Sequence, residues 1–271
     1  MATTTTATEA TTRTPPIIRA WESHLTLYRA IWKSNVLGSF IQPLLYLVGM
    51  GLGVGALVDS GERSDVLLDG LTYFQFLAPG LIATTAMLIS ANEAMWPVTG
   101  GFKWMRSFHA QAATPLMPRQ IMGGVALWHA TKALIAVVGV TSVLVLFDGT
   151  RGWGLLLAVP FGVLTGVAFS APVMAWSASR ETDHSFPTIN RFVIMPLFLF
   201  GGAFYPVSQL PDWMEPIAKV TPLWHGVELT RGAVHGRLEL GSTLVHVAVL
   251  ASLAAAGWFL AARSFARRLQ S

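Results

Sequence analysis

Charge and cysteine are what this sequence has least of. Only 12% of its 271 residues are charged, 53% are hydrophobic, and the mean hydropathy is +0.54. Soluble domains carry about 25% charged residues, so half of the usual charge is missing. Cysteine is absent, which excludes disulfides, thiolate metal sites and thiol chemistry. The composition therefore predicts a protein embedded in a membrane.

Catalytic and nucleotide-binding motifs are also missing. The sequence has no GxxxxGKS or GxxxxGKT loop for ATP, no HExxH pair for zinc and no GxSxG turn for a nucleophilic serine. The histidines do not cluster at ligand spacing, so we expect this chain to bind no metal and no cofactor itself. The net charge of +4 does not indicate nucleic acid as a partner, because the basic residues lie at the ends of apolar segments, as membrane topology requires.

Apolar segments make up most of the remaining chain and predict an all-α membrane protein. Residues 1–16 are rich in Thr and Ala and are expected to be a disordered tail rather than a signal peptide. Residues 17–34 predict an amphipathic helix, either lying on the membrane surface or packed on the rest of the protein. Residues 35–265 form the predicted transmembrane domain, and 266–271 a basic tail. The six predicted spans are about residues 36–58, 73–96, 121–147, 153–179, 192–207 and 240–262.

The positive charges give this arrangement an orientation. Six spans place both termini on one side of the membrane, and twelve of the 18 Lys and Arg residues fall on that side. Five fall on the opposite side, and Lys132 lies within a span. Because cytoplasmic loops carry the excess of positive charge, both termini are expected in the cytoplasm.

The stretch 186–236 is unusual within this plan. It begins as an apolar helix and continues into proline-interrupted, amphipathic sequence that is too hydrophobic for a loop and too charged for a span. We interpret it as the fifth span followed by an extracellular re-entrant helical hairpin before the sixth. The hairpin residues singled out are Trp213, Trp224, His225 and Glu228, and we expect the tryptophans to seat it in the membrane interface.

Two ionisable residues, Glu93 and Lys132, lie inside predicted spans. A charge at mid-bilayer is costly, so they are expected to pair with each other or to reach the interface, in a structural role rather than a transport role. Four glycines alternate at positions 49, 51, 53 and 55, which we read as sites of close helix packing and not as a nucleotide-binding loop.

An ordered set of segments resembles a known family. The segments are PLLYLVGMGLGVG (43–55), YFQFLAPGLIATTAM (73–87), AATPLMPRQIMGG (112–124), LWHATKAL (127–134) and FLFGGAFYPVSQLPDWMEPIAKVTPLWHGVELTRG (198–232). Together they resemble the membrane subunit (permease) of an ABC-2 type exporter, in the nodulation-protein-J and daunorubicin-resistance permease branch. Met117 and Gly124 depart from the pattern of many relatives, where a serine and an acidic residue occur.

The resemblance implies a bacterial inner-membrane subunit that is not itself an enzyme. It would pair with a second permease copy or paralogue and with two separate ABC ATPase subunits, which hold ATP and magnesium. The cargo would be an amphiphile: a lipid, a glycolipid or lipo-oligosaccharide, or a hydrophobic drug. A cytoplasmic coupling helix would lie at about Gly101–Gln111 and contact the ATPase through Phe102, Trp104, Arg106, Phe108 and His109.

The resemblance also implies a translocation path between the first and fifth spans of the pair. Its candidate lining residues are Gln42, Tyr46, Phe192, Phe198, Phe200 and Phe204. The aromatic residues are equally compatible with ordinary packing. Two other classes remain open at this point: a membrane enzyme acting on lipids at the outer interface, with His225 and Glu228 as acid and base, and a scaffold that transports nothing.

Overall fold

The computed structural model describes residues 14–61 and 64–270, and within these ranges every regular element is a helix. The predicted tail, residues 1–16, falls almost wholly outside the described residues. The elements in order are α1 (Pro16–Tyr46), η1 (Leu47–Val54), α2 (Gly55–Asp59), α3 (Ser64–Leu67), α4 (Tyr73–Lys103), α5 (Ser107–Ala112), α6 (Pro118–Leu144), α7 (Gly154–Ala178), α8 (Phe186–Ile189), η2 (Asn190–Ile194), α9 (Met195–Phe200), η3 (Val207–Gln209), α10 (Glu215–Val220), α11 (Pro222–Val234) and α12 (Leu240–Gln270).

Long apolar helices make the chain a multi-pass membrane protein. Among the described residues, five helices are long and apolar enough to cross a bilayer: Ile41–Asp59, Tyr73–Lys103, Pro118–Leu144, Gly154–Ala178 and Leu240–Gln270. The predicted fifth span corresponds to a shorter apolar helix, Phe186–Phe200. This helix falls short of the roughly 20 residues that a membrane crossing needs. The described residues therefore contain five candidate spans, and the six-span arrangement with its re-entrant hairpin stays a prediction.

The short fifth helix ends earlier than expected because of its glycines. We predicted a span to residue 207, but the helix stops at Phe200 and Gly201–Gly202 follow. Gly202 has φ +81°, a left-handed conformation that a residue with a side chain adopts only at a cost. A side chain on Gly201 would collide with Leu223 of α11. The glycine pair thus turns the chain closely against the hairpin.

Helix α4 begins where the sequence predicts and ends later. Thr72 and Gln75 form a reciprocal capping box, with the Gln75 amide donating to Thr72 Oγ1 at 3.3 Å and the Thr72 amide to Gln75 Oε1 at 3.0 Å. The sequence predicts that this helix ends at residue 96. In the structure it continues through Pro97 and ends at Lys103. Proline lacks the N–H that would bond the Glu93 carbonyl. The ring of His129, on α6, lies beside the Glu93 backbone.

The predicted amphipathic helix and first span are one continuous helix, α1, which continues into η1. The amino-terminal part of α1 packs on α6, where Ile17 and Ala20 lie against Gly123 and Gly124. The Trp21 indole also donates to Thr131 Oγ1 at 3.0 Å. Residues 47–54 are wound as a π-helix, a rare form that often marks functional sites. Of the alternating glycines, Gly51 faces Phe74 of α4, as close packing requires, whereas Gly49 faces open space.

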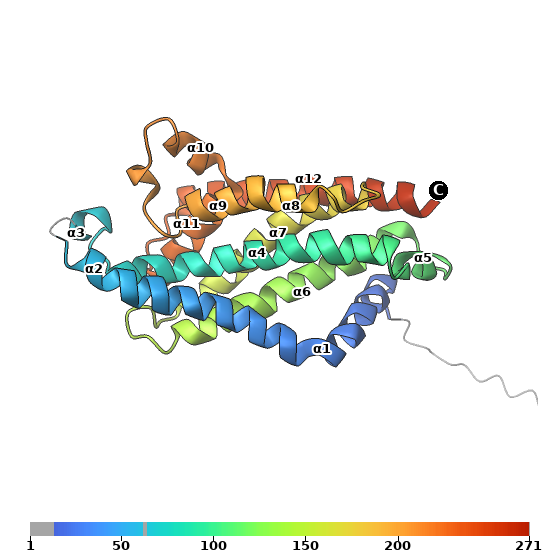
Figure 1. Ribbon diagram of the computed structural model, residues 1–271, viewed down its shortest axis with the longest axis horizontal. Helices are drawn as coiled ribbons and strands as arrows, with labels where there is room; N and C mark the ends of the chain where they lie inside the picture. The colour runs from blue at the N-terminus through green and yellow to red at the C-terminus, as the bar shows by residue number, and fades with distance from the viewer. Residues whose placement is uncertain (1–13, 62–63, 271) are drawn as a thin grey trace, which may run out of the picture.

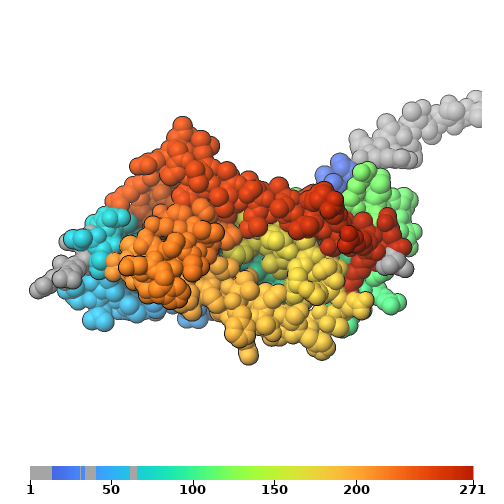
Figure 2. Space-filling view, turned by 90° about the horizontal axis from the view of Figure 1, so that it is seen from above, coloured from blue at the N-terminus to red at the C-terminus, as the bar shows by residue number. Residues whose placement is uncertain are grey.

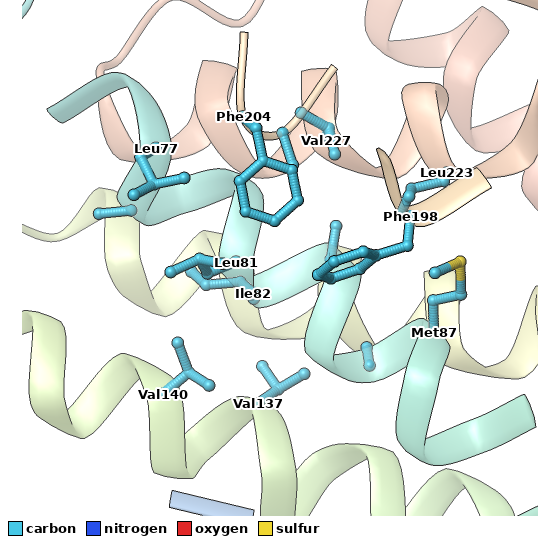
Figure 3. Close-up of a cluster of buried hydrophobic side chains, with 14 of the residues drawn as sticks. Leu77, Leu81, Ile82, Met87, Val137, Val140, Phe198, Phe204, Leu223 and Val227 are labelled. Carbon is cyan, nitrogen blue, oxygen red and sulfur yellow. The ribbon is translucent and has the colours of Figure 1, made fainter. Parts of the chain in front are cut away.

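Helix α4 lies at the centre of the bundle, between α6 and α7 (Figure 1). Of the most apolar stretch of α4, 72% is buried, against 17% for α12 and 22% for Ile41–Asp59. Figure 3 shows the main core, where side chains from α4 and α6 meet those of the fifth helix, the turn after it and α11: Leu77, Leu81, Ile82, Met87, Val137, Val140, Phe198, Phe204, Leu223 and Val227. The peripheral helices therefore present much of their apolar surface outward.

The two ends of the bundle differ. At one end, called the α5 end, lie α5, the start of α1 and the last turns of α12 (Figure 1). At the other end, called the hairpin end, lie α2, α3, α10 and α11. Figure 2 shows α12 in red along one edge of the molecule, with the orange segment of the hairpin gathered beside α2 and α3. Both described ends of the chain thus lie at the α5 end.

Candidate functional site

A short helix, α5, is fixed to the end of α4 by an aromatic cluster. The chain reverses direction over 104–106, and Arg106 has φ 52°, in the left-handed region. The rings of Phe102, Phe108 and Phe265 pack together, with centroids 4.8–5.4 Å apart. A side chain at Gly101 would collide with Phe108, so glycine is needed where the two helices meet. Helix α5 is therefore held firmly against α4 and α12.

The five residues predicted to contact a partner divide into two groups. Phe102 and Phe108 are 2% and 1% exposed and belong to the cluster beneath the surface. Trp104, Arg106 and His109 are exposed, Trp104 by 55%. The exposed three place an indole, a guanidinium and an imidazole on the outside of the α5 end. Only these three are placed to meet another protein directly.

The ionisable residues of the predicted spans lie together. Lys132 Nζ is 3.0 Å from Glu93 Oε1, and the two side chains are 7% and 19% exposed. The Tyr28 ring, from α1, lies 4.9 Å from the same ammonium. The ion pair joins α4 to α6, and Tyr28 adds α1. Sequence reasoning singled out the two charges but missed Tyr28, whose only signal was its helical spacing from other aromatic residues of α1.

The candidate path residues lie in two different environments. Tyr46, Phe198 and Phe204 form one aromatic cluster, with ring centroids 4.9–5.7 Å apart, and Phe198 and Phe204 are 5% and 7% exposed. These two phenylalanines are part of the core of the protomer. In contrast, Phe192 is 76% exposed and Phe200 36%. Gln42 is exposed as well.

At the hairpin end, Arg231 ties the hairpin to the bundle. Its guanidinium binds Glu228 Oε1 at 3.0 Å and donates to the carbonyls of Gly202 at 2.7 Å and Phe76 at 3.4 Å. It also lies 3.8 Å from the centroid of the Phe76 ring. Burial lowers the pKa of Arg231, and the adjacent Glu228 carboxylate opposes this shift. Sequence analysis used Arg231 only for counting charge, because a lone arginine gives no sign of such partners.

The other predicted hairpin residues are also engaged or exposed. His225 Nδ1 faces His246 Nδ1 of α12 at 2.6 Å, and Trp224 packs edge-on against both rings. Burial and then the charge of His246 lower the pKa of His225. Trp213 is 68% exposed. Because His225 is turned to His246 and Glu228 to Arg231, the geometry does not favour His225 and Glu228 as an acid–base pair.

Comparisons with known proteins connect these features to a family. The family model described as ABC-2 type transporter matches residues 17–235, from the start of α1 to the end of α11. The chain belongs to the ABC-2 type transporter family. It is 31% identical to Nodulation protein J of Rhizobium meliloti over 93% of each chain, and to Nodulation protein J of Rhizobium leguminosarum bv. viciae over 86% of this chain and 87% of that one. It is 22% identical to the inner membrane transport permease YadH of Escherichia coli over 75% and 76%.

Membership of this family identifies the chain as a membrane permease with a role in transport. In the sequence, the resemblance lay in the segments around α4, the start of α6 and the hairpin, and the family match covers all of them. Across residues 14–61 and 64–270, no three His, Asp or Glu side chains gather closely enough to hold a metal ion. The features that bear on transport are therefore α5, the exposed apolar faces and the cavities between helices.

Proposed function

We propose that the chain is the non-catalytic permease subunit of an ATP-binding-cassette exporter. With a second permease it forms the path for an amphiphile: a lipid, a glycolipid or lipo-oligosaccharide, or a hydrophobic drug. Two separate ATPase subunits, which hold ATP and magnesium, drive the cycle. The family supports a transport role, the sequence has no phosphate-binding loop of its own, and similar proteins are named for nodulation and for inner-membrane transport.

The observation that carries this proposal is the construction of α5. Three exposed side chains capable of strong contacts, Trp104, Arg106 and His109, stand on the buried cluster of Phe102, Phe108 and Phe265. Because that cluster joins α5 to both α4 and α12, a force applied to the exposed face is passed to two long helices rather than lost in a loop. The central helix α4 then carries the displacement into the core.

The exposed apolar faces support a path shared with a second permease. On the first span Leu45, Val48 and Leu52 are 50–66% exposed, and on the fifth helix Phe192 is 76% exposed. In a membrane such faces meet lipid or another helix. We place the path between them, with both termini of the chain in the cytoplasm of a bacterial inner membrane, as the distribution of positive charge predicts.

The test removes exposed side chains of α5 without disturbing its support. We expect Trp104→Ala combined with Arg106→Asn to abolish export and to weaken co-purification with the partner ATPase. Asparagine is chosen because it tolerates the left-handed backbone at position 106 better than alanine. Phe108→Ala, by contrast, should unfold the cluster and lower the unfolding temperature, so it is not diagnostic.

The matched control is Trp153→Ala, which removes an equally large side chain that is 85% exposed. It lies just before α7, away from the α5 cluster, and should leave export and co-purification unchanged. Normal export by the Trp104→Ala, Arg106→Asn variant would refute the assignment of α5 as the coupling element.

A further inference from the structure

A cleft of about 300 Å³, called here the basic cleft, lies at the α5 end between the last turns of α7 and α12. Figure 2 shows these two helices side by side at the surface, α12 in red and α7 in yellow. The lining carries three arginines, one glutamate and three small residues: Arg180, Arg267, Arg268, Glu181, Ala178, Ser179 and Ser264. All of them belong to α7, to α12 or to the segment directly after α7. The basic cleft is therefore separate from the transport path proposed between the first span and the fifth helix.

One arginine of the basic cleft has a structural task. Arg268 donates to the carbonyls of Arg180 at 2.7 Å and Ala178 at 3.2 Å, and its guanidinium lies 4.3 Å from the centroid of the Phe102 ring. The last carbonyls of a helix lack partners within it, and they carry the negative end of its dipole. Arg268 thus joins the end of α7 to α12 and to the aromatic cluster beneath α5.

The other two arginines, Arg180 and Arg267, are exposed and have a different environment. Across residues 14–61 and 64–270, no carboxylate forms an ion pair with either guanidinium. Arg180 lies 5.5 Å from the centroid of the Trp176 ring, a cation–π contact that keeps its charge beside the cleft. With Arg268 occupied by the α7 carbonyls, two positive charges and the negative charge of Glu181 remain. The net charge of +1 is complementary to one phosphodiester, whose oxygens guanidinium groups bind well.

An exposed apolar surface leads away from the basic cleft along α12. Leu260, Ser264 and Arg267 follow one another at helical spacing and so lie on one face. Leu260 is 51% exposed, and the Phe259 ring, which Arg263 covers at 4.1 Å, is still 55% exposed. Because α12 is a candidate span, these side chains meet lipid chains in a membrane. A ligand held at Arg267 can therefore place an apolar chain against Leu260, about 10 Å further along the helix.

We propose that the basic cleft binds an anionic phospholipid of the surrounding membrane. Arg180 and Arg267 hold its phosphodiester, and an acyl chain lies along Leu260 and Phe259. Basic pockets between spans are suited to such headgroups. A free phosphate or an acidic peptide carries the same charge but makes no use of the apolar surface of α12. The lipid is a resident of the protein and not its cargo, and its phosphate adds a second link between the ends of α7 and α12.

The experiment measures lipid binding to the full-length chain in a maltoside detergent by native mass spectrometry. The probe is phosphatidylglycerol. Its competitors are phosphatidylethanolamine with the same acyl chains, glycerophosphoglycerol, which is the headgroup without chains, and inorganic phosphate. The cleft variant, Arg180→Gln with Arg267→Gln, removes two charges and keeps Arg268. The matched control, Arg19→Gln with Arg119→Gln, removes two exposed arginines at the starts of α1 and α6.

We expect phosphatidylglycerol to bind the natural protein and the control variant equally. The cleft variant should bind it about tenfold more weakly, because each arginine near a membrane surface adds severalfold to the affinity for an anionic lipid. Glu181→Gln should tighten the binding, since it removes the negative charge of the lining. Phosphatidylethanolamine should compete weakly, and the two probes without chains should not compete.

Equal weakening in the control variant would overturn the proposal, because the lipid would then follow total charge. Effective competition by inorganic phosphate would overturn it in favour of a free-anion site. Weaker binding by Glu181→Gln would instead indicate a lipid whose ammonium contacts this carboxylate. Full lipid binding by the cleft variant, together with loss of the partner ATPase, would assign both arginines to a protein contact.

The unfolding temperature of the lipid-free cleft variant shows whether lost binding is lost folding. We expect it to equal that of the natural protein, because both side chains are exposed and Arg268 is kept. If the double substitution does unfold the chain, Arg267→Gln alone provides the same comparison, with a severalfold loss of affinity expected. Unchanged binding by that variant would refute the site. This assay contains no ATPase, so its outcome is independent of the proposed role of α5.

Discussion

The pair Glu93–Lys132 illustrates how single residues join helices in this protein. Its two side chains come from α4 and α6, are largely buried, and lie 3.0 Å apart with the Tyr28 ring of α1 above the ammonium. The sequence could predict that these charges needed partners, because an uncompensated charge inside a span is costly. It could not predict Tyr28, since contacts between helices far apart in the chain leave no local pattern.

Removing one member of this pair should destabilise the protein more than removing both. Lys132→Met leaves the Glu93 carboxylate buried and unpaired, at a cost of about 3–5 kcal/mol. Glu93→Leu combined with Lys132→Met restores an apolar contact and should recover most of the loss. The unfolding temperature in nanodiscs measures both variants. A double variant less stable than Lys132→Met would contradict this account.

His24 should make stability depend on pH. Its pKa is lowered by burial from 6.5 to about 4, so between these values the unfolded chain binds a proton that the folded chain does not. The free energy of unfolding should therefore be constant above about pH 6.5 and fall as the pH drops toward 4, by up to about 3 kcal/mol. Urea titrations across this range, compared with His24→Phe, test the effect. The variant should lose this part of the slope.

At the scale of elements, helix starts were easier to predict than helix ends. The start of α4 at Tyr73 agrees with the predicted start of the second span, and the capping box of Thr72 and Gln75 stabilises it. The predicted end at residue 96 was too early, since α4 runs to Lys103. The helix continues through Pro97, where the ring of His129, remote in sequence, lies beside the Glu93 backbone. Likewise the α5 segment was placed by family resemblance, but which of its residues face inward depends on Phe265, far along the chain.

The contact between α1 and α6 depends on the absence of a side chain at Gly124. A Cβ there would press on Ala20 and on the α1 backbone. Gly124→Val should therefore separate the amino-terminal part of α1 from α6 and expose Trp21. Limited proteolysis should then cleave within residues 17–34 severalfold faster than in the natural protein. Gly241→Ala, in a helix position with no neighbour within 4 Å, is the control and should change nothing. Unchanged protection of Gly124→Val would contradict the packing.

For the whole molecule, the count of positive charges predicts which side of the membrane each end faces. Helix packing alone does not define this orientation. Ser208→Cys, exposed at the hairpin end, should react in intact cells with a maleimide that cannot cross membranes. Ser179→Cys, exposed after α7, should react only after the cells are opened. The reverse pattern would place the termini outside. Reaction of both thiols in intact cells would rule out the six-span arrangement.

Helix α4 is longer than a membrane is thick. Its 31 residues extend about 46 Å at roughly 1.5 Å per residue, whereas the hydrocarbon core measures about 30 Å. If the excess lies at the α5 end, we expect α5 at the level of the lipid headgroups. The thickness of the surrounding bilayer would thus set how far α5 stands from the hydrocarbon core.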